Sequence, residues 1–162
     1  MLIRTLSPFV RQSGGSPVCA KRIGTFTDVV FNGTFSPGLS PAIVPLNNVN
    51  FGPNSTLLME IGGLIPGSQH DQIDIGGVFG LNGLLDVDLI NGFNPALGNT
   101  FNILNGTTSG SFGSFSFPSL NPGLSWDTSD LYTLGNLKIV PEPGTVTLLL
   151  AGLGALLRRR RR

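Results

Sequence analysis

The chain's only histidine lies in its most chemically suggestive group of residues. His70 is followed by Asp71 and then by Asp74, a grouping that could support acid–base chemistry or a metal site. One histidine with no accompanying cysteine is a poor donor set for a transition metal. Strand periodicity would also send Asp71 and Asp74 to opposite faces. We therefore expect His70 to lie at a loop tip, with no metal or catalytic role.

A second acidic pair, Asp86 and Asp88, would project two carboxylates from one strand face, roughly 7 Å apart. Such a pair is compatible with glycosidic acid–base catalysis or with weak Ca²⁺ binding. No nucleophile motif, phosphate-binding loop or second acidic strand accompanies the pair in the sequence. We expect a solvated face of a strand.

Two aromatic residues, Trp126 and Tyr132, bracket Asp127 and Asp130. They could form a carbohydrate-stacking patch, but aromatic side chains more often pack in a core. The single cysteine, Cys19, can form no intrachain disulfide and no cysteine-based metal cluster. The sequence thus predicts no catalytic residue, no metal and no cofactor.

The composition limits the fold of this 162-residue chain. It contains 23 glycines and 12 prolines, and 40% of its residues are apolar while only 12% are charged. Disordered tails need low hydrophobicity and high net charge. Helical bundles tolerate glycine and proline poorly. The composition therefore favours a single all-β domain with many turns.

Charge is distributed unevenly along the chain. Residues 23–157 contain nine acidic residues and one lysine, so this stretch carries a net charge of −8 (one positive, nine negative). Such a body repels phosphate backbones, which excludes nucleic acid as a partner.

The pattern of turns and alternation predicts short strands. Asn-Gly pairs, which favour tight turns, begin at Asn32, Asn82, Asn91 and Asn105. Between them apolar residues alternate, as where Leu85, Val87 and Leu89 would face inward. The predicted strands are Val29–Phe31, Ser55–Ile61, Asp71–Ile75, Val78–Leu81, Gly83–Ile90, Thr100–Leu104, Ser111–Phe117, Leu131–Leu134 and Asn136–Val140. We expect an all-β fold of short stacked strands, either the end of a β-solenoid (parallel β-helix) or a β-sandwich, with one C-terminal hydrophobic helix.

The C-terminal end predicts a membrane segment. Residues 145–157 carry no charge and would span about 20 Å as a helix, short of the roughly 30 Å hydrocarbon core. The five arginines that follow can extend this span, because their stems reach along lipid to the headgroups. Positive charge also keeps this end cytoplasmic, so the body would face outward. A buried core helix with a solvated tail is the alternative, but residues 146–157 show no charged face.

The last residues, VPEPGTVTLLLAGLGALLRRRRR, resemble the PEP-CTERM sorting signal of exported bacterial proteins. The resemblance implies recognition by an exosortase, a membrane protease that is expected to cleave near the Pro-Glu-Pro motif and release the body to the envelope or surface. It implies that Pro141, Glu142 and Pro143 form the recognition motif. The implied membrane segment includes Thr145, Leu148, Leu149, Leu150, Gly152, Leu153, Gly154, Leu156 and Leu157. The implied cytoplasmic anchor is Arg158, Arg159, Arg160, Arg161 and Arg162.

The body is similar to the last rungs of Gly-rich, autotransporter-like β-solenoid proteins of bacterial surfaces. The matching positions are turn and core residues: Asp71, Gln72, Gly76, Gly83, Gly92, Phe93, Pro95, Gly98, Phe101 and Ile103. Asn99 stands where those proteins usually carry an acid. The resemblance implies stacked strands and export, with Phe93, Phe101, Phe112, Phe115 and Phe117 filling the stack.

These observations divide the chain into residues 1–22, a poorly structured N-terminal segment, residues 23–140, the β body, and residues 141–162, the sorting segment. The first 26 residues show no apolar run of a secretory signal, so we expect the natural protein to begin further upstream. The favoured hypothesis is an exported structural or adhesive envelope protein, held first in the inner membrane, with extracellular polysaccharide as a candidate partner. The alternatives are a β-helix enzyme acting on polysaccharide and a single-span protein whose tail is never processed.

Overall fold

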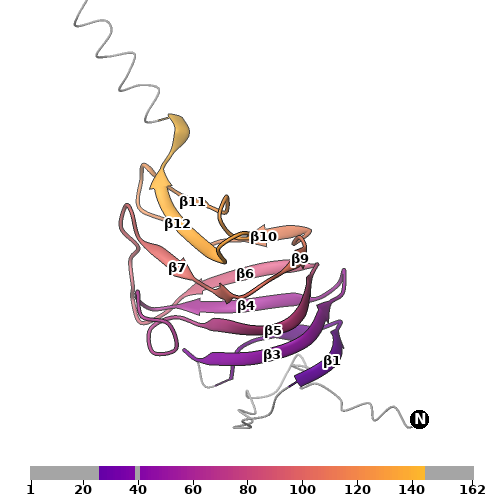
Figure 1. Ribbon diagram of the computed structural model, residues 1–162. Helices are drawn as coiled ribbons and strands as arrows, with labels where there is room; N and C mark the ends of the chain where they lie inside the picture. Colours follow the sequence, from indigo (N-terminus) through magenta and orange to yellow (C-terminus); the bar gives the residue numbers. More distant parts are fainter. Residues whose placement is uncertain (1–25, 39–40, 145–162) are drawn as a thin grey trace, which may run out of the picture.

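Short strands are the main secondary structure of the computed structural model, which describes residues 26–38 and 41–144 (Figure 1). The strands are β1 (Phe26–Phe31), β2 (Thr34–Phe35), β3 (Ile43–Phe51), β4 (Thr56–Ile61), β5 (Gln72–Leu81), β6 (Leu84–Leu89), β7 (Thr100–Asn102), β8 (Leu104–Asn105), β9 (Ser109–Gly110), β10 (Ser114–Ser116), β11 (Leu124–Asp127) and β12 (Asn136–Pro141).

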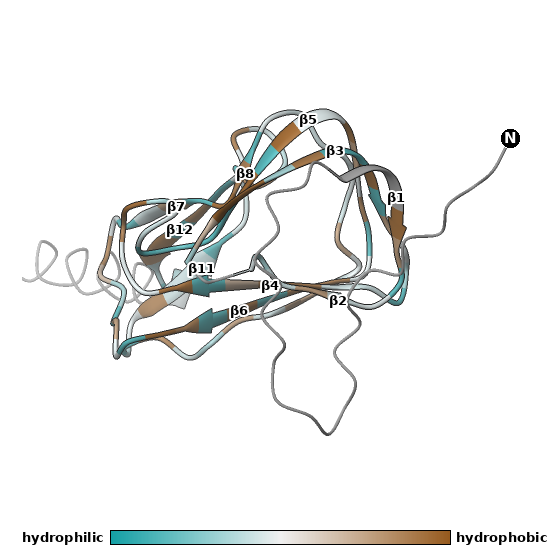
Figure 2. Ribbon diagram, turned by 90° about the horizontal axis from the view of Figure 1, so that it is seen from below, coloured by the Kyte–Doolittle hydropathy of each residue, from teal (hydrophilic) through white to brown (hydrophobic). Residues whose placement is uncertain are grey.

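Two of the three sheets are parallel and form opposite walls of a coil. Sheet A has the order β1-β3-β5-β8, with β9 also paired to β5, and sheet B has the order β10-β6-β4-β2. Each described pairing in these two sheets is parallel. Figure 2, which looks along the stack, shows β3 and β5 on one side and β4 and β6 on the other. The fold is therefore a parallel β-solenoid, and the β-sandwich alternative, which requires antiparallel sheets, is wrong.

The rungs of this solenoid stack in register, so equivalent apolar side chains lie above one another. In sheet B, Phe35 pairs with Leu57, Leu57 with Leu85, and Leu85 with Phe115. Hydrogen bonds between rungs join residues 30 apart at Val78 and Asn48. Leu57 and Leu85 are fully buried, and burying one such side chain contributes about 1.5–3 kcal/mol.

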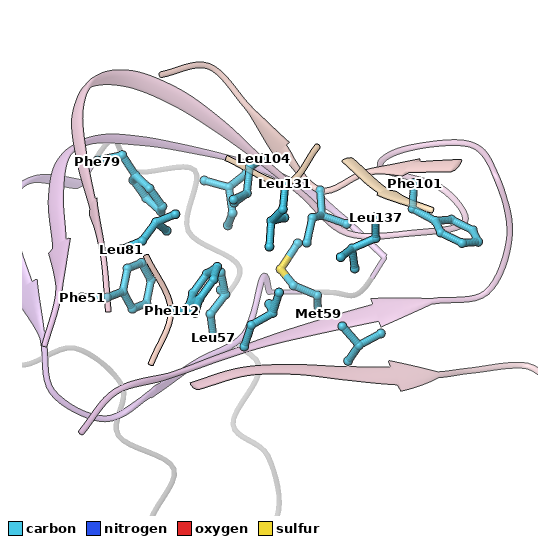
Figure 3. Packing of buried hydrophobic residues seen from close by; sticks show 14 of the residues in the cluster. Phe51, Leu57, Met59, Phe79, Leu81, Phe101, Leu104, Phe112, Leu131 and Leu137 are labelled. Carbon is cyan, nitrogen blue, oxygen red and sulfur yellow. The ribbon is translucent and has the colours of Figure 1, made fainter. Parts of the chain in front are cut away.

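The core fills the space between the two walls. Sheet A contributes Leu46, Ile73 and Phe79, all fully buried, and sheet B contributes Met59 opposite them. Figure 3 shows Met59, Leu57 and Phe79 among the side chains that point into this space. Because each sheet alternates inward and outward residues, one apolar face per strand is enough to build this core.

A bulge repeats between neighbouring rungs of sheet A. The register of β3 against β5 shifts between Asn47 and Val49, and Asn48 has a φ of 51°. Gly77 lies beside it with a φ of 78°, and the Val78 amide donates to Asn48 Oδ1 at 3.0 Å. The asparagine and the glycine both tolerate positive φ, so the two bulges stack without interrupting the coil.

An antiparallel sheet closes the end of the stack. This cap, β11-β12-β7, pairs Trp126 with Ile139 and Leu137 with Phe101. Leu137 and Ile139 are buried, so the cap covers the apolar interior at the C-terminal end of the coil. Antiparallel pairing also ends the parallel register, because β12 offers no edge that a further rung could continue.

Several sequence-predicted strands differ from the structure. The predicted strand Leu131–Leu134 is wrong, since these residues form a turn in which the Leu134 amide donates to Asp130 O at 2.9 Å. Asp71–Ile75 and Val78–Leu81 belong to one strand, β5, which continues through the bulge at Gly77. The pattern missed β3, because its proline and three asparagines indicate a turn in sequence.

Gly83 and Gly92 both have positive φ, of 72° and 68°. Comparing alanine substitutions at the two sites distinguishes the cost of backbone strain from the cost of crowding. A Cβ at Gly83 would lie 2.2 Å from Ser55 O of the preceding rung, whereas one at Gly92 would meet nothing within 4 Å. We expect Gly92→Ala to cost about 1 kcal/mol of unfolding free energy through strain alone. Gly83→Ala should cost about 3 kcal/mol, since the rung backbone must also move. Urea unfolding measures both, and equal losses would contradict the close approach at this corner.

Candidate functional site

His70 is buried rather than at a loop tip, so the sequence-based placement is wrong. Its side chain is 1% exposed in the connection between β4 and β5. Nδ1 lies 3.1 Å from Gly63 O and Nε2 lies 3.3 Å from Asn102 O. The ring also packs edge-on against Phe101, with centroids 5.8 Å apart. The histidine therefore fastens the loop to the cap.

Burial is the largest influence on the pKa of His70 and lowers it, while the carbonyls of Gly63 and Asn102 partly offset this by raising it. A neutral imidazole carries one N–H, so it can donate to only one of these two carbonyl oxygens. The folded state thus favours the neutral ring, in which one nitrogen donates to a carbonyl oxygen.

Asp71 is fully buried. Its Oδ1 accepts from the Ala42 amide at 2.8 Å, and its Oδ2 accepts from the Glu60 amide at 2.9 Å. The Asp71 amide in turn donates to Glu60 O at 2.9 Å. One carboxylate therefore ties the start of β3 and the end of β4 to the start of β5. Asp71 and Asp74 do not converge, because Asp74 is exposed and accepts from Asn105 Nδ2 at 2.9 Å.

The pair Asp86 and Asp88 lies on the outer face of sheet B. Asp88 is exposed and Asp86 is half-buried. Glu60 is the cross-strand partner of Asp88, so this face gathers three carboxylates in two adjacent strands. Within the described residues, no group of three or more His, Cys, Asp or Glu is placed to hold a metal ion. The face is solvated, as the alternation in sequence predicts.

The aromatic residues of the cap pack against one another. Trp126 is half-buried, stacks on Phe117 with centroids 5.4 Å apart, and donates from Nε1 to Pro118 O at 3.0 Å. Tyr132 accepts from the Phe112 amide through its hydroxyl at 3.1 Å. Trp126 therefore packs as the core-packing interpretation expects, whereas Tyr132 is exposed, so that interpretation is wrong for Tyr132.

The two acids between these aromatics are also engaged. The Ser129 amide donates to Asp127 Oδ1 and the Ser129 hydroxyl to Oδ2, each at 2.9 Å, and these bonds lower the pKa of Asp127. Asp130 forms an ion pair with Lys138, and this contact raises the pKa of the lysine. These charges fix the turn between β11 and β12.

The Pro-Glu-Pro sequence begins inside the folded body. Pro141 is the last residue of β12 and pairs with Leu124 of β11. The Glu142 amide donates to Gly123 O at 2.9 Å. The side chains of Pro141, Glu142 and Pro143 are nevertheless exposed, so a partner can reach them while the backbone is held.

The expected membrane segment and arginine anchor, residues 145–162, lie outside the described residues, as does the whole N-terminal segment, residues 1–22. In the part of the chain that the structure describes, no helix has the length and apolar character to cross a membrane.

Comparison with protein families identifies the motif at the C-terminal end. Residues 140–162 match the model of the PEP-CTERM protein-sorting motif. The chain carries a PEP-CTERM sorting signal. The PEP-CTERM motif implies a protein that is exported, recognised by an exosortase and sorted to the cell envelope. No curated protein and no solved structure matches the chain. No relative therefore supports the likeness of the body to autotransporter-like surface proteins.

Sequence reasoning found the sorting motif. It missed the backbone group that holds this motif and the buried residues that hold the connection between β4 and β5. Gly123 gives no sequence signal for its contact with Glu142, because the two meet only when β11 pairs with β12. Asp71 does carry a signal in retrospect. An acid directly before a buried strand is well placed to accept backbone amides that a corner leaves unpaired.

The lowered pKa of His70 predicts a pH dependence of stability. The unfolded chain binds a proton near pH 6.5, the ordinary value, while the folded chain resists it. Stability is therefore fully present above pH 6.5 and falls as the pH drops below it. We expect His70→Gln, which keeps a donor but cannot titrate, to lose less unfolding free energy than the wild type between pH 8 and pH 5. Urea unfolding at the two pH values tests this, and identical losses would contradict it.

Asp71 and Asp74 form a matched pair for a test of the buried carboxylate. Asp71→Ala leaves the Ala42 and Glu60 amides without their acceptor, which should cost about 3 kcal/mol or more. Asp74→Ala removes an exposed hydrogen bond and should change stability by about 0.5 kcal/mol at most. Thermal and urea unfolding compare the two variants, and a similar loss in both would argue against the structural role of Asp71.

Proposed function

We propose that this protein is a structural or adhesive component of the cell envelope or surface, delivered by its C-terminal signal. The observation that carries the proposal is the match of residues 140–162 to the PEP-CTERM protein-sorting motif. The β-solenoid body would be the delivered part, and the tail would serve only as the signal for sorting.

Each part of the tail has a proposed role. Pro141, Glu142 and Pro143 are the motif that an exosortase recognises. Thr145–Leu157 form the segment that holds the chain in the inner membrane before processing. Arg158–Arg162 keep the end of the chain cytoplasmic, because positive residues resist translocation. Exosortase cleavage near the motif would then release the body outward.

The body supports a structural role through the way in which it uses its polar residues. His70 and Asp71, the two residues closest to a catalytic pair, are bound to backbone groups. The described residues are strongly negative, with nine acids and one lysine. An extracellular polysaccharide is a candidate partner, and this charge favours a neutral or cationic polymer.

Two alternatives lead to different observations. A polysaccharide-active enzyme would bring acidic side chains together in one groove, and the nearest case is the outer face of sheet B with Glu60, Asp86 and Asp88. These carboxylates lie on the face of a sheet in adjacent strands. A permanently anchored protein would differ only in its mature C-terminus, which would still contain Arg162.

The exchange Glu142→Gln tests the sorting motif, with Glu60→Gln as the matched control on sheet B. In a host with an exosortase, the chain is exported behind a cleavable signal peptide. We expect the unprocessed form of Glu142→Gln to accumulate to about tenfold the wild-type level, because the substitution removes the motif's charge. Glu60→Gln should be sorted as the wild type is. Mass spectrometry of the surface material reads the C-terminus. An intact Arg162 in wild-type surface material would refute the proposal and favour the anchored alternative.

A further inference from the structure

The end of β12 is held by the cap on one side only. Val140 pairs with Ser125 and Pro141 with Leu124, both residues of β11. Opposite β11, the pairing of β12 with β7 ends at Lys138. On that side Ile139 makes two backbone bonds, in which its amide donates to Asn99 O at 2.9 Å and its carbonyl accepts from the Gly98 amide at 3.0 Å.

This arrangement separates a firmly held part of β12 from a weakly held part. Leu137 and Ile139 are buried under the cap, so their release would expose core. Beyond Ile139 the side chains are exposed or half-buried, and Pro141 has no amide to donate. Local opening is cheapest where few buried contacts and few backbone bonds resist it. The chain can therefore detach from Val140 onward without unfolding the solenoid.

Detachment matters because proteases bind their substrates as extended strands through the substrate backbone. The Glu142 amide already donates to Gly123 O, and Pro141 lies opposite Leu124 in the ladder. A protease active site and β11 cannot both pair with this backbone edge at one time. The exposed motif side chains can be recognised on the folded body, but the backbone edge that faces β11 cannot be bound until it leaves β11.

We propose that the Gly123–Ser125 segment of β11 is a positioning element for sorting, which holds the backbone of the PEP-CTERM motif and releases it, with Ile139 as the hinge, before the tail is cut. This inference rests on the proposed function, because it requires that an exosortase process the chain. It assigns to the body a direct part in sorting: the cap presents the motif side chains and sets how often the backbone is free.

A reversible lock tests the proposal. Ser125 and Val140 are directly paired, and hydrogen-bonded antiparallel pairs have Cα atoms about 5.5 Å apart, within the range of a disulfide. The variant Ser125→Cys/Val140→Cys, with Cys19→Ser to remove the native thiol, fastens the end of β12 to β11. Its matched controls are Cys19→Ser alone and Cys19→Ser/Val140→Cys, which cannot form the lock.

A second variant releases the motif. A flexible linker of six residues, alternating Gly and Ser, is inserted between Val140 and Pro141. It separates the motif from β11 and leaves the spacing between the motif and the hydrophobic segment unchanged. All chains are exported in the exosortase host, and tail loss is followed by pulse–chase and by mass spectrometry. Protease resistance of the body confirms that each variant is folded.

We expect the locked chain to lose its tail about tenfold more slowly than its controls, and a membrane-permeant reductant to restore the rate. The released chain should be processed at least as fast as the wild type. A locked, oxidised chain that is processed at the control rate overturns the inference, and so does slower processing of the released chain. If the wild type itself is not processed, the proposed function fails instead, so the two failures are distinguishable.

Discussion

In-register stacking of apolar side chains between rungs is the constraint on which this structure depends. A parallel rung has no turn that fixes it to its neighbour, so its register is set by what lies above and below each interior position. The row Phe35, Leu57 and Leu85 shows this in sheet B, and it ends at Phe115, which is paired with Leu85 but is exposed rather than filling the stack. A slip of one residue would turn the row outward and place residues such as Asp86 in the core.

The polar features of the body follow from this constraint. A coil must turn corners, and each corner leaves backbone amides that no sheet satisfies. Asp71 and His70 meet this need at the corner that precedes β5, where they bind amides and carbonyls from several rungs. Their burial is thus explained by support of the coil. The outward acids, such as Asp88, are not required by any corner and remain in solvent.

The cap joins the structure of the body to its sorting signal. Because the parallel stack must end somewhere, β11, β12 and β7 pair in antiparallel fashion at its end, and Leu137 and Ile139 of β12 are buried against the interior. The same strand that closes the core continues into Pro141 and Glu142. Closing the solenoid and displaying the PEP-CTERM motif are therefore one structural event, and a change in the cap affects both.

Local pattern was enough to predict the class of fold and the sorting signal. The alternation of apolar residues predicted almost the full extent of β4 and β6. The uncharged segment and the terminal arginines indicated the sorting tail without reference to any other part of the chain. These features were predictable because each depends on neighbours within a few residues. Strand β3 was not, because Pro45 and its asparagines favour a turn until β1 and β5 pair with it on both sides.

The sequence by itself determined an all-β body, acids mostly on its surface and a PEP-CTERM tail. Only the tertiary structure decided that the strands pair in parallel, that His70 and Asp71 are buried, and that Glu142 is bound to Gly123. The physical reason is distance along the chain. Ala42 and Asp71 are 29 residues apart, and His70 and Asn102 are 32 apart. Contacts of this kind exist only once the rungs have stacked, so local sequence does not specify which distant groups will meet.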